Sequence, residues 1–241
     1  MGRGSSKAGG GGGAAKTPSG MTYDQFMQLS ESERYDKANE IINNPNIKVP
    51  DYLDSSDTTK LIYGLGMNTK PTVVSDSQLD QMQGREIYRT VYETGTMPPP
   101  STDMVTDQIR NGDFTQMSGK GGSAHGRAIY FATDFYDSAM YGHGERNPMI
   151  MRAKINPTAK IMTETKLGNL VSGDSAFQSK VNISSSRDSK AIWALSHGID
   201  GWYSGSYTMI VNRGALTASS QNKKIYNGRS TTTSWAASPN V

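Results

Sequence analysis

The sequence predicts an α+β protein with largely antiparallel strand pairing, preceded by a small helical segment. Up to Gly84, apolar residues recur at helical spacing behind helix-capping residues. Beyond Gly84, the chain contains short runs rich in Ile, Tyr, Phe and Val that are bounded by Gly, Pro, Asn and Asp. Because helices separate these runs only occasionally, without regular βαβ alternation, antiparallel pairing is favoured over a parallel sheet.

The helical segment begins with two capping boxes, Thr22 with Gln25 and Ser30 with Glu33. Each predicts a short helix directly after its Thr or Ser. In the second helix the apolar residues recur every three to four positions, and Asn43 to Pro45 end it. Two more helices are predicted further along, over about 54–65 and 76–82.

The strands are predicted from the apolar and aromatic runs that follow Gly84. These runs cover residues 86–93, 128–134, 149–156, 159–163 and 201–212. Helices are predicted between them over about 101–110, 134–141 and 186–196.

The chain divides into four parts by composition. Residues 1–20 contain a run of five glycines and have almost no side chain to bury, so a disordered Gly-rich arm is expected. Residues 21–84 form the helical segment and residues 85–218 the main α+β domain. Residues 219–241 are nearly as polar as the arm and are predicted to be a polar tail.

Composition excludes several classes of protein. No window of the 241 residues approaches the roughly 18 consecutive apolar residues of a membrane helix, and the first residues lack the apolar run of a secretory signal. A soluble, unexported protein without a membrane partner is expected. The absence of cysteine excludes disulfides, thiolate zinc sites and iron–sulfur clusters. Only three residues offer a nitrogen ligand, so no metal site is expected: His125, His143 and His197.

The net charge of +3 resides in the two ends of the chain. Residues 1–20 and 219–241 carry three basic residues each and no acid, whereas residues 21–218 carry 19 basic and 22 acidic residues. Binding to duplex nucleic acid requires several Lys or Arg side chains directed at phosphates from one face. No specific duplex partner is therefore expected for the slightly acidic body.

Two cofactor signatures fail on their context. Residues 119–124 fit G-x-G-x-x-A, but a polar stretch precedes them and a strand follows, whereas a dinucleotide fold requires a strand before the glycines and a helix after them. His143 to Glu145 fits the H-x-E of zinc deaminases, which also require a P-C-x-x-C pair that a chain without cysteine lacks.

Residues 121–143 carry the most informative pattern. A glycine loop leads into a strand ending in Tyr130, Phe131 and Ala132, and a helix follows on which Ser138 and Tyr141 share one face. Two tyrosines can enclose a flat aromatic ring, and a serine hydroxyl can bond a carboxamide, so these side chains suit nicotinamide. The alternative is that they are ordinary core tyrosines and a helical serine.

The same stretch resembles the ADP-ribosyltransferases, which cleave the nicotinamide–ribose bond of NAD and transfer ADP-ribose to an acceptor. The block G-x-G-I-Y-F-A…S-A-x-Y of the poly(ADP-ribose) polymerase and diphtheria-toxin branch is matched without a gap by Gly126, residues 128–132 and residues 138–141. The resemblance covers about residues 60–218. It implies a fold of split antiparallel β-sheets, with NAD as substrate and with Tyr130, Ser138 and Tyr141 around the nicotinamide and its ribose.

The first motif of this family is similar to residues 87–90, Ile-Tyr-Arg-Thr. The resemblance implies that Arg89 is a catalytic and NAD-binding residue beside the ribose, as in the arginine-type toxins and phage-borne transferases. A guanidinium suits diphosphate or ribose oxygens. The backbone of Thr90 is expected to bond the carboxamide.

The third family motif is similar to residues 199–212, but Ser206 stands where the family has a glutamate. That glutamate stabilises the positive charge on the ribose as the glycosidic bond breaks. A serine bonds the ribose hydroxyl without supplying negative charge. Arg89, Tyr130 and Ser206 are therefore the candidate catalytic residues, and Ser206 decides whether catalysis is expected at all.

Three functions remain open at this stage. The first is an NAD-dependent mono-ADP-ribosyltransferase that modifies a host macromolecule, foremost a host protein. The second is a catalytically degenerate transferase fold that serves as a structural or binding module of a virion, with phage head proteins as partners. The third is an NAD glycohydrolase. Residues 63–74 and the following strand resemble phage-encoded, head-associated transferase-like proteins, which implies the bacterial host cytoplasm or the virion as location.

Overall fold

The computed structural model describes residues 17–49, 55–67, 71–93 and 125–224. Four segments with sequence-based predictions lie outside these residues. They are the Gly-rich arm over 1–16, the helix over 101–110, the glycine loop over 119–124 and the end of the tail over 225–241.

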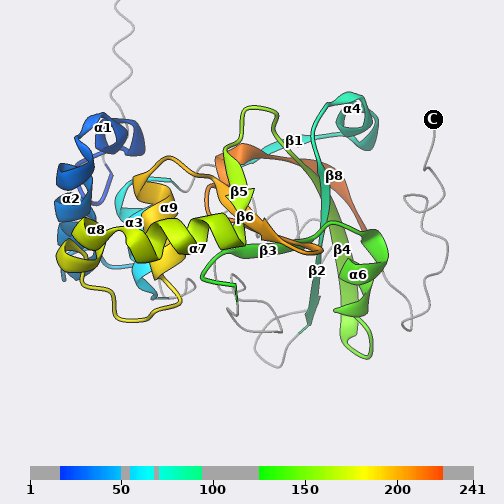
Figure 1. The fold of residues 1–241 in the computed structure, drawn as a ribbon. Helices are drawn as coiled ribbons and strands as arrows, with labels where there is room; N and C mark the ends of the chain where they lie inside the picture. Colours follow the sequence, from blue (N-terminus) through cyan, green and yellow to red (C-terminus); the bar gives the residue numbers. More distant parts are fainter. Residues whose placement is uncertain (1–16, 50–54, 68–70, 94–124, 225–241) are drawn as a thin grey trace, which may run out of the picture.

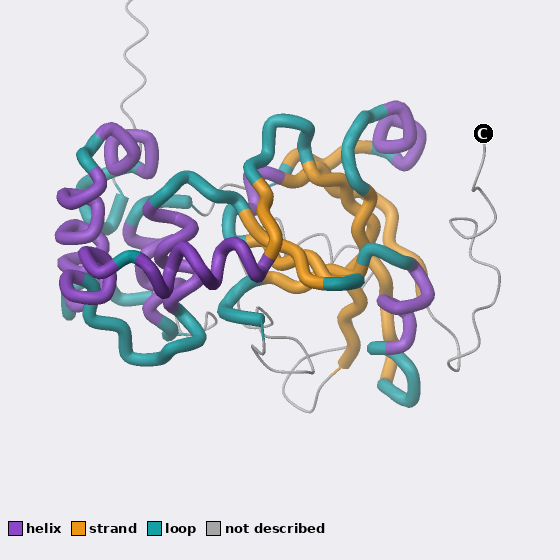
Figure 2. The backbone as a smooth tube through the Cα atoms, in the orientation of Figure 1, coloured by secondary structure: helices purple, strands orange, loops and turns teal. Residues whose placement is uncertain are grey.

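α1, α2, α3, α7, α8 and α9 gather at one end of the described structure, and the strands, with α4 and α6, lie at the other (Figures 1 and 2). The strands form an eight-stranded mixed sheet, and several helices accompany it, so the predicted α+β class is confirmed. No helix in the described part of the chain has both the length and the apolar character needed to cross a membrane.

The first three helices lie at the helical end, beside α8 and α9. Both predicted capping boxes are present: the Thr22 and Ser30 hydroxyls accept from the Gln25 and Glu33 amides, and both N3 side chains return a bond. A third cap, Ser56, accepts from the Thr59 amide. The helices are α1 (Tyr23–Gln28), α2 (Glu31–Asn43) and α3 (Asp57–Gly64).

The sheet has the strand order β1-β8-β4-β2-β3-β7-β6-β5. Its pairs are antiparallel except β1 with β8 and β5 with β6, which are parallel. The strands are β1 (Thr72–Val74), β2 (Glu86–Glu93), β3 (Ile129–Ala132), β4 (Arg146–Ile155), β5 (Ile161–Thr163), β6 (Gly201–Ser204), β7 (Tyr207–Ile210) and β8 (Leu216–Lys224).

One junction in the sheet is much thinner than the others. β2 and β3 share the single residue pair Tyr88 and Ala132, whereas β2 and β4 pair over most of their length. The sheet therefore has two four-stranded halves, which meet at this junction between β2 and β3. We call it the β2–β3 seam.

The remaining helices lie on both parts of the molecule. α4 packs against β8, α6 against β2 and β3, and α9 against α2 and α3, while α7 contacts both α9 and β6 (Figure 1). Their bounds are α4 (Asp76–Gln81), α6 (Phe135–Met140), α7 (Glu164–Gly173), α8 (Ser175–Lys180) and α9 (Ser189–Ser196), with a 3-10 turn, η2 (Arg213–Ala215).

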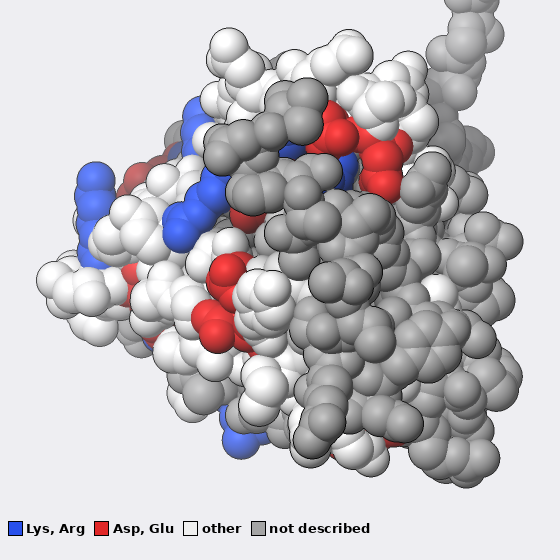
Figure 3. Space-filling view, turned by 90° about the vertical axis from the view of Figure 1, so that its right-hand side faces the viewer, with Lys and Arg blue, Asp and Glu red and all other residues white. Residues whose placement is uncertain are grey.

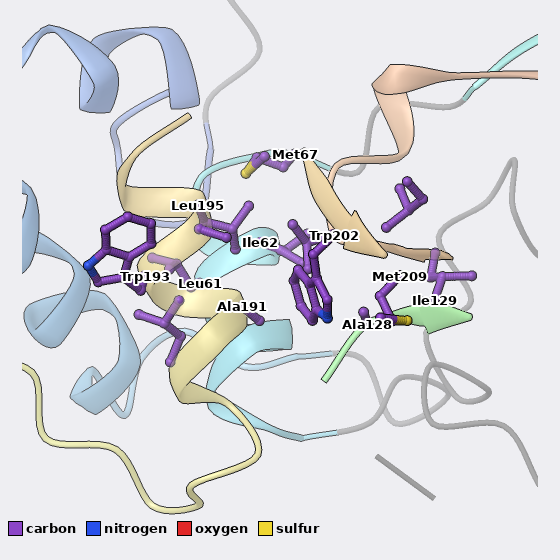
Figure 4. Close-up of a cluster of buried hydrophobic side chains, with 14 of the residues drawn as sticks. Leu61, Ile62, Met67, Ala128, Ile129, Ala191, Trp193, Leu195, Trp202 and Met209 are labelled. Atoms are coloured by element: carbon purple, nitrogen blue, oxygen red, sulfur yellow. The ribbon is translucent and has the colours of Figure 1, made fainter. Parts of the chain in front are cut away.

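One hydrophobic core joins the helices to the sheet. Trp202 of β6 is fully buried and lies between side chains of α3 and α9 on one side and of β3 and β7 on the other (Figure 4). Its indole nitrogen donates to the His125 carbonyl at 3.0 Å, so the ring also fixes the loop before β3. Because Trp202 packs between the helices and the sheet, the helical segment and the sheet share one core.

Several segments differ from the sequence-based predictions. β1 lies within the segment predicted as helical over 21–84, and residues 219–224, predicted as the start of the tail, continue β8. β1 pairs with β8, and the end of β8 pairs with β4. This pairing uses backbone hydrogen bonds, which polar residues form as well as apolar ones. Residues 17–20, predicted as arm, form a turn in which the Ser19 amide donates to the Gly64 carbonyl at 3.1 Å. α7 and α8 were not predicted.

Candidate functional site

Of the predicted site residues, Arg89, Thr90 and Tyr130 lie on the two strands of the β2–β3 seam. Ser138 lies on α6, Tyr141 directly follows that helix, and Ser206 lies apart from them in the β6–β7 turn. Arg89 lies on β2, is buried, and donates through Nη1 to the Tyr130 carbonyl of β3 at 2.8 Å. This side-chain bond crosses the seam where the two strands share one backbone pair. The guanidinium therefore helps to hold the two halves of the sheet together as well as lying beside Tyr130.

Thr90 and Ser138 bond to each other. The Thr90 hydroxyl donates to the Ser138 carbonyl at 2.7 Å and lies 3.0 Å from the Ser138 hydroxyl. Since the single Thr90 proton goes to the carbonyl, Ser138 is the donor in the contact between the two hydroxyls. Ser138 is buried, so its hydroxyl joins α6 to β2 in this structure. To bond a carboxamide, it would have to exchange this partner.

Tyr130 closes the loop that leads into β3. Its hydroxyl donates to the Gly126 carbonyl at 2.6 Å and accepts from the His125 amide at 3.0 Å. Burial raises the pKa of Tyr130 to about 12, so the hydroxyl stays protonated at neutral pH. Gly126 has φ +104°, and a Cβ there would lie 3.1 Å from the Trp202 ring, which accounts for glycine at this turn.

Tyr141 contacts a third tyrosine that the sequence analysis did not select as a site residue. Its hydroxyl donates to the Tyr207 hydroxyl at 2.8 Å, and burial together with this contact raises its pKa. The Tyr207 ring also stacks on the His125 ring. The two ring centroids are 5.8 Å apart, and the angle between the ring planes is 29°. Tyr130, His125, Tyr207 and Tyr141 therefore form a connected aromatic group.

A carboxylate adjoins this aromatic group. Glu164, the first residue of α7, lies 2.7 Å from His125 Nδ1 and 2.5 Å from Lys190 Nζ, and its side chain is 17% exposed. Burial by itself would raise the pKa of Glu164, but hydrogen bonds from Lys190, Ser204 and His125 outweigh it and hold the pKa below its usual value. The carboxylate is therefore ionised at neutral pH.

Ser206 lies in the tight turn between β6 and β7, after Gly205 at φ +56°. Its carbonyl accepts from the Thr133 amide at 2.8 Å, which joins the turn to the end of β3. Ser204, two residues earlier, bonds Glu164. The Glu164 carboxylate of α7 thus bonds the last residue of β6, which precedes Ser206 by two residues.

The sequence analysis missed Glu164, His125 and Tyr207 as site residues. Tyr207 had a signal, because it directly follows Ser206 in the segment similar to the third family motif. Glu164 and His125 are 39 residues apart and share no motif, so only the folded chain brings them together.

Acidic and basic side chains are interspersed on the described part of the face in Figure 3.

Comparison with protein-family models, with curated proteins and with solved structures finds no match to this chain.

Proposed function

We propose that this protein binds NAD beside the β2–β3 seam and transfers its ADP-ribose to an acceptor macromolecule, as an ADP-ribosyltransferase with a split sheet. In this proposal nicotinamide leaves with the electron pair of its bond to the ribose. The acceptor nucleophile forms the new bond to the ribose and gives up a proton. The observation that carries the proposal is the aromatic group around Tyr130 and Tyr141, in which Arg89 bonds the Tyr130 carbonyl and Glu164 adjoins His125.

The thin seam supports the split-sheet part of the proposal. One residue pair joins two four-stranded halves, and the Arg89 guanidinium crosses between them. Fewer residue pairs join β2 to β3 than join β2 to β4 or β3 to β7. Arg89, Thr90 and Tyr130, three of the residues that the resemblance assigns to NAD, lie on these two strands.

Glu164 offers the negative charge that Ser206 lacks. A carboxylate close to a developing oxocarbenium-like centre lowers the barrier, commonly by a few kcal/mol. Lys190 and His125 share this carboxylate, and their proximity reduces its field at the ribose. We therefore expect slow cleavage of NAD rather than rapid turnover.

Nicotinamide release from NAD by the purified full chain tests catalysis. Glu164→Gln keeps the shape of the side chain and removes its charge, so release should fall at least tenfold. Glu40→Gln, the same change at an exposed position of α2, is the matched control and should leave release unchanged. Equal release by the two variants would exclude Glu164 from catalysis.

Titration calorimetry with NAD tests the binding step separately. Tyr141→Ala should weaken binding roughly tenfold, because an aromatic pair contributes about 1–1.5 kcal/mol. Tyr136→Ala on the same helix is the control, since Tyr136 is 55% exposed. A wild-type protein that does not bind NAD would overturn the proposal.

The second candidate is a degenerate transferase fold that binds NAD or a protein partner without catalysis, for example in a phage virion. Ser206 at the glutamate position and the ion pairs of Glu164 favour it. NAD binding without nicotinamide release, by both wild type and Ser206→Glu, would support this candidate over the enzyme.

A further inference from the structure

Three side chains of the metal-ligating type converge at the helical end of the molecule. Glu31 begins α2, Asp174 links α7 to α8 as their shared cap, and His197 caps the end of α9. One oxygen or nitrogen atom of each lies within 4.8 Å of the others. No metal site was expected from the sequence, because only three histidines offer a nitrogen ligand. The three residues that converge here lie far apart along the chain.

The surroundings of His197 fix which ring nitrogen faces the other two side chains. Nδ1 lies 2.8 Å from the Trp193 carbonyl, which only accepts, so Nδ1 carries a proton. The ring also stacks on the Trp193 indole at 3.7 Å. A metal-binding histidine is commonly held in this way, with its outer nitrogen bonded to a carbonyl and its other nitrogen directed at the ion.

The other nitrogen, Nε2, faces oxygen atoms. It lies 3.3 Å from Glu31 Oε2 and 3.1 Å from the Tyr35 hydroxyl oxygen. The Tyr35 hydroxyl has one proton and donates it to Asp174, in the shorter of its two contacts. A neutral His197 would therefore direct its lone pair at oxygen lone pairs. The arrangement favours a positive centre between these atoms.

Asp174 retains the capacity to bind such a centre. Its carboxylate accepts from the Tyr35 hydroxyl, from Trp193 Nε1 at 2.9 Å and from the Phe177 amide at 2.8 Å. A carboxylate has about four lone-pair sites, so one remains. The Glu31 side chain is 55% exposed, which gives an ion access from solvent and lets this ligand adjust its position.

We propose that Glu31, Asp174 and His197 bind one divalent transition-metal cation, with zinc as the best-fitting ion. Zinc binds imidazole and carboxylate ligands at about 2.0–2.2 Å. Two ligands of a tetrahedral ion at that bond length are about 3.3 Å apart, which equals the observed separation of 3.3 Å between His197 Nε2 and Glu31 Oε2. The ion would join α2, α9 and the junction of α7 with α8, and would stabilise the folded chain.

Titration of the chelator-treated full chain with zinc chloride tests the site by calorimetry and thermal unfolding. Wild type should bind one zinc ion per chain and unfold at a higher temperature with zinc than without it. Glu31→Gln should weaken zinc binding at least tenfold. Glu40→Gln, on the same helix and also exposed, should bind as wild type does.

Cobalt supplies a second readout that does not depend on stability. Cobalt bound to wild type should give the visible absorption bands of a tetrahedral ion, and His197→Gln should remove them. Equal zinc affinity in Glu31→Gln and Glu40→Gln would place bound zinc elsewhere and overturn the proposal. Absence of stoichiometric binding to wild type would also overturn it.

Discussion

At the scale of single residues, Gly84 shows how closely the backbone before β2 approaches the end of β4. It lies between α4 and β2 with φ +127°, and a Cβ there would be 2.2 Å from the Ile155 carbonyl oxygen. The Ile155 amide donates to the Arg85 carbonyl at 3.0 Å, so the two segments cannot separate without losing a backbone hydrogen bond. Only glycine fits this position without strain.

Gly84→Ala should therefore lower the free energy of unfolding by roughly 1–3 kcal/mol, as measured by urea denaturation. The matched control is Gly168→Ala within α7, where an added Cβ has no atom within 4 Å. Since alanine favours helix over glycine, the control should raise stability by roughly 0.5–1 kcal/mol. Similar losses in both variants would contradict the close approach at Gly84.

At the scale of secondary-structure elements, the capping box of α2 was predicted from the sequence and is present in the structure. The Ser30 hydroxyl and Glu33 side chain satisfy each other's backbone amides at the start of the helix. The buried face of α2 consists of Tyr35, Ala38, Ile41 and Ile42 and packs into the main core. Fraying of the first turn of α2 would thus disturb a helix whose buried side chains are part of the main core.

Ser30→Ala should cost about 1 kcal/mol of folding free energy, because it leaves the Glu33 amide without its side-chain acceptor. Ser30→Asn supplies an alternative cap and should retain most of the stability. Chemical denaturation of both variants measures the difference. A Ser30→Ala protein as stable as Ser30→Asn would mean that the cap contributes little here.

At the scale of the whole molecule, Glu164 joins segments that are distant in the chain: α7, the loop before β3, α9 and β6. Its pKa is below the ordinary value of 4.5 in the folded chain, because hydrogen bonds outweigh burial. For a carboxyl with a lowered folded pKa, the stabilisation is fully present above the unfolded pKa. It is lost as the pH falls through the folded pKa.

The melting temperature of wild type should therefore decline steeply below about pH 4.5. Glu164→Gln has no charge to lose at this position, so its decline over the same range should be shallower. The two curves should differ most at neutral pH and converge in acid. Parallel curves from pH 7 to pH 3 would show that the Glu164 network does not couple folding to protonation.

The sequence by itself determined what depends on neighbours three or four residues apart. The starts of α1 and α2 follow from hydroxyls that reach the third following amide, and β2 was predicted over its observed bounds, 86–93. The α+β class followed from the change in periodicity at Gly84. α7 gave a weaker signal, because only Leu167 and Val171 face the core and two glycines interrupt it.

Only the tertiary structure decided which distant side chains meet. It paired β8 with β4, so that backbone hydrogen bonding holds polar residues such as Asn222 and Lys223 in the strand. It also brought Glu164 to His125, and His197 to Glu31 and Asp174. Contacts of this kind depend on how the core packs helices against the sheet, and no local spacing in the sequence encodes them.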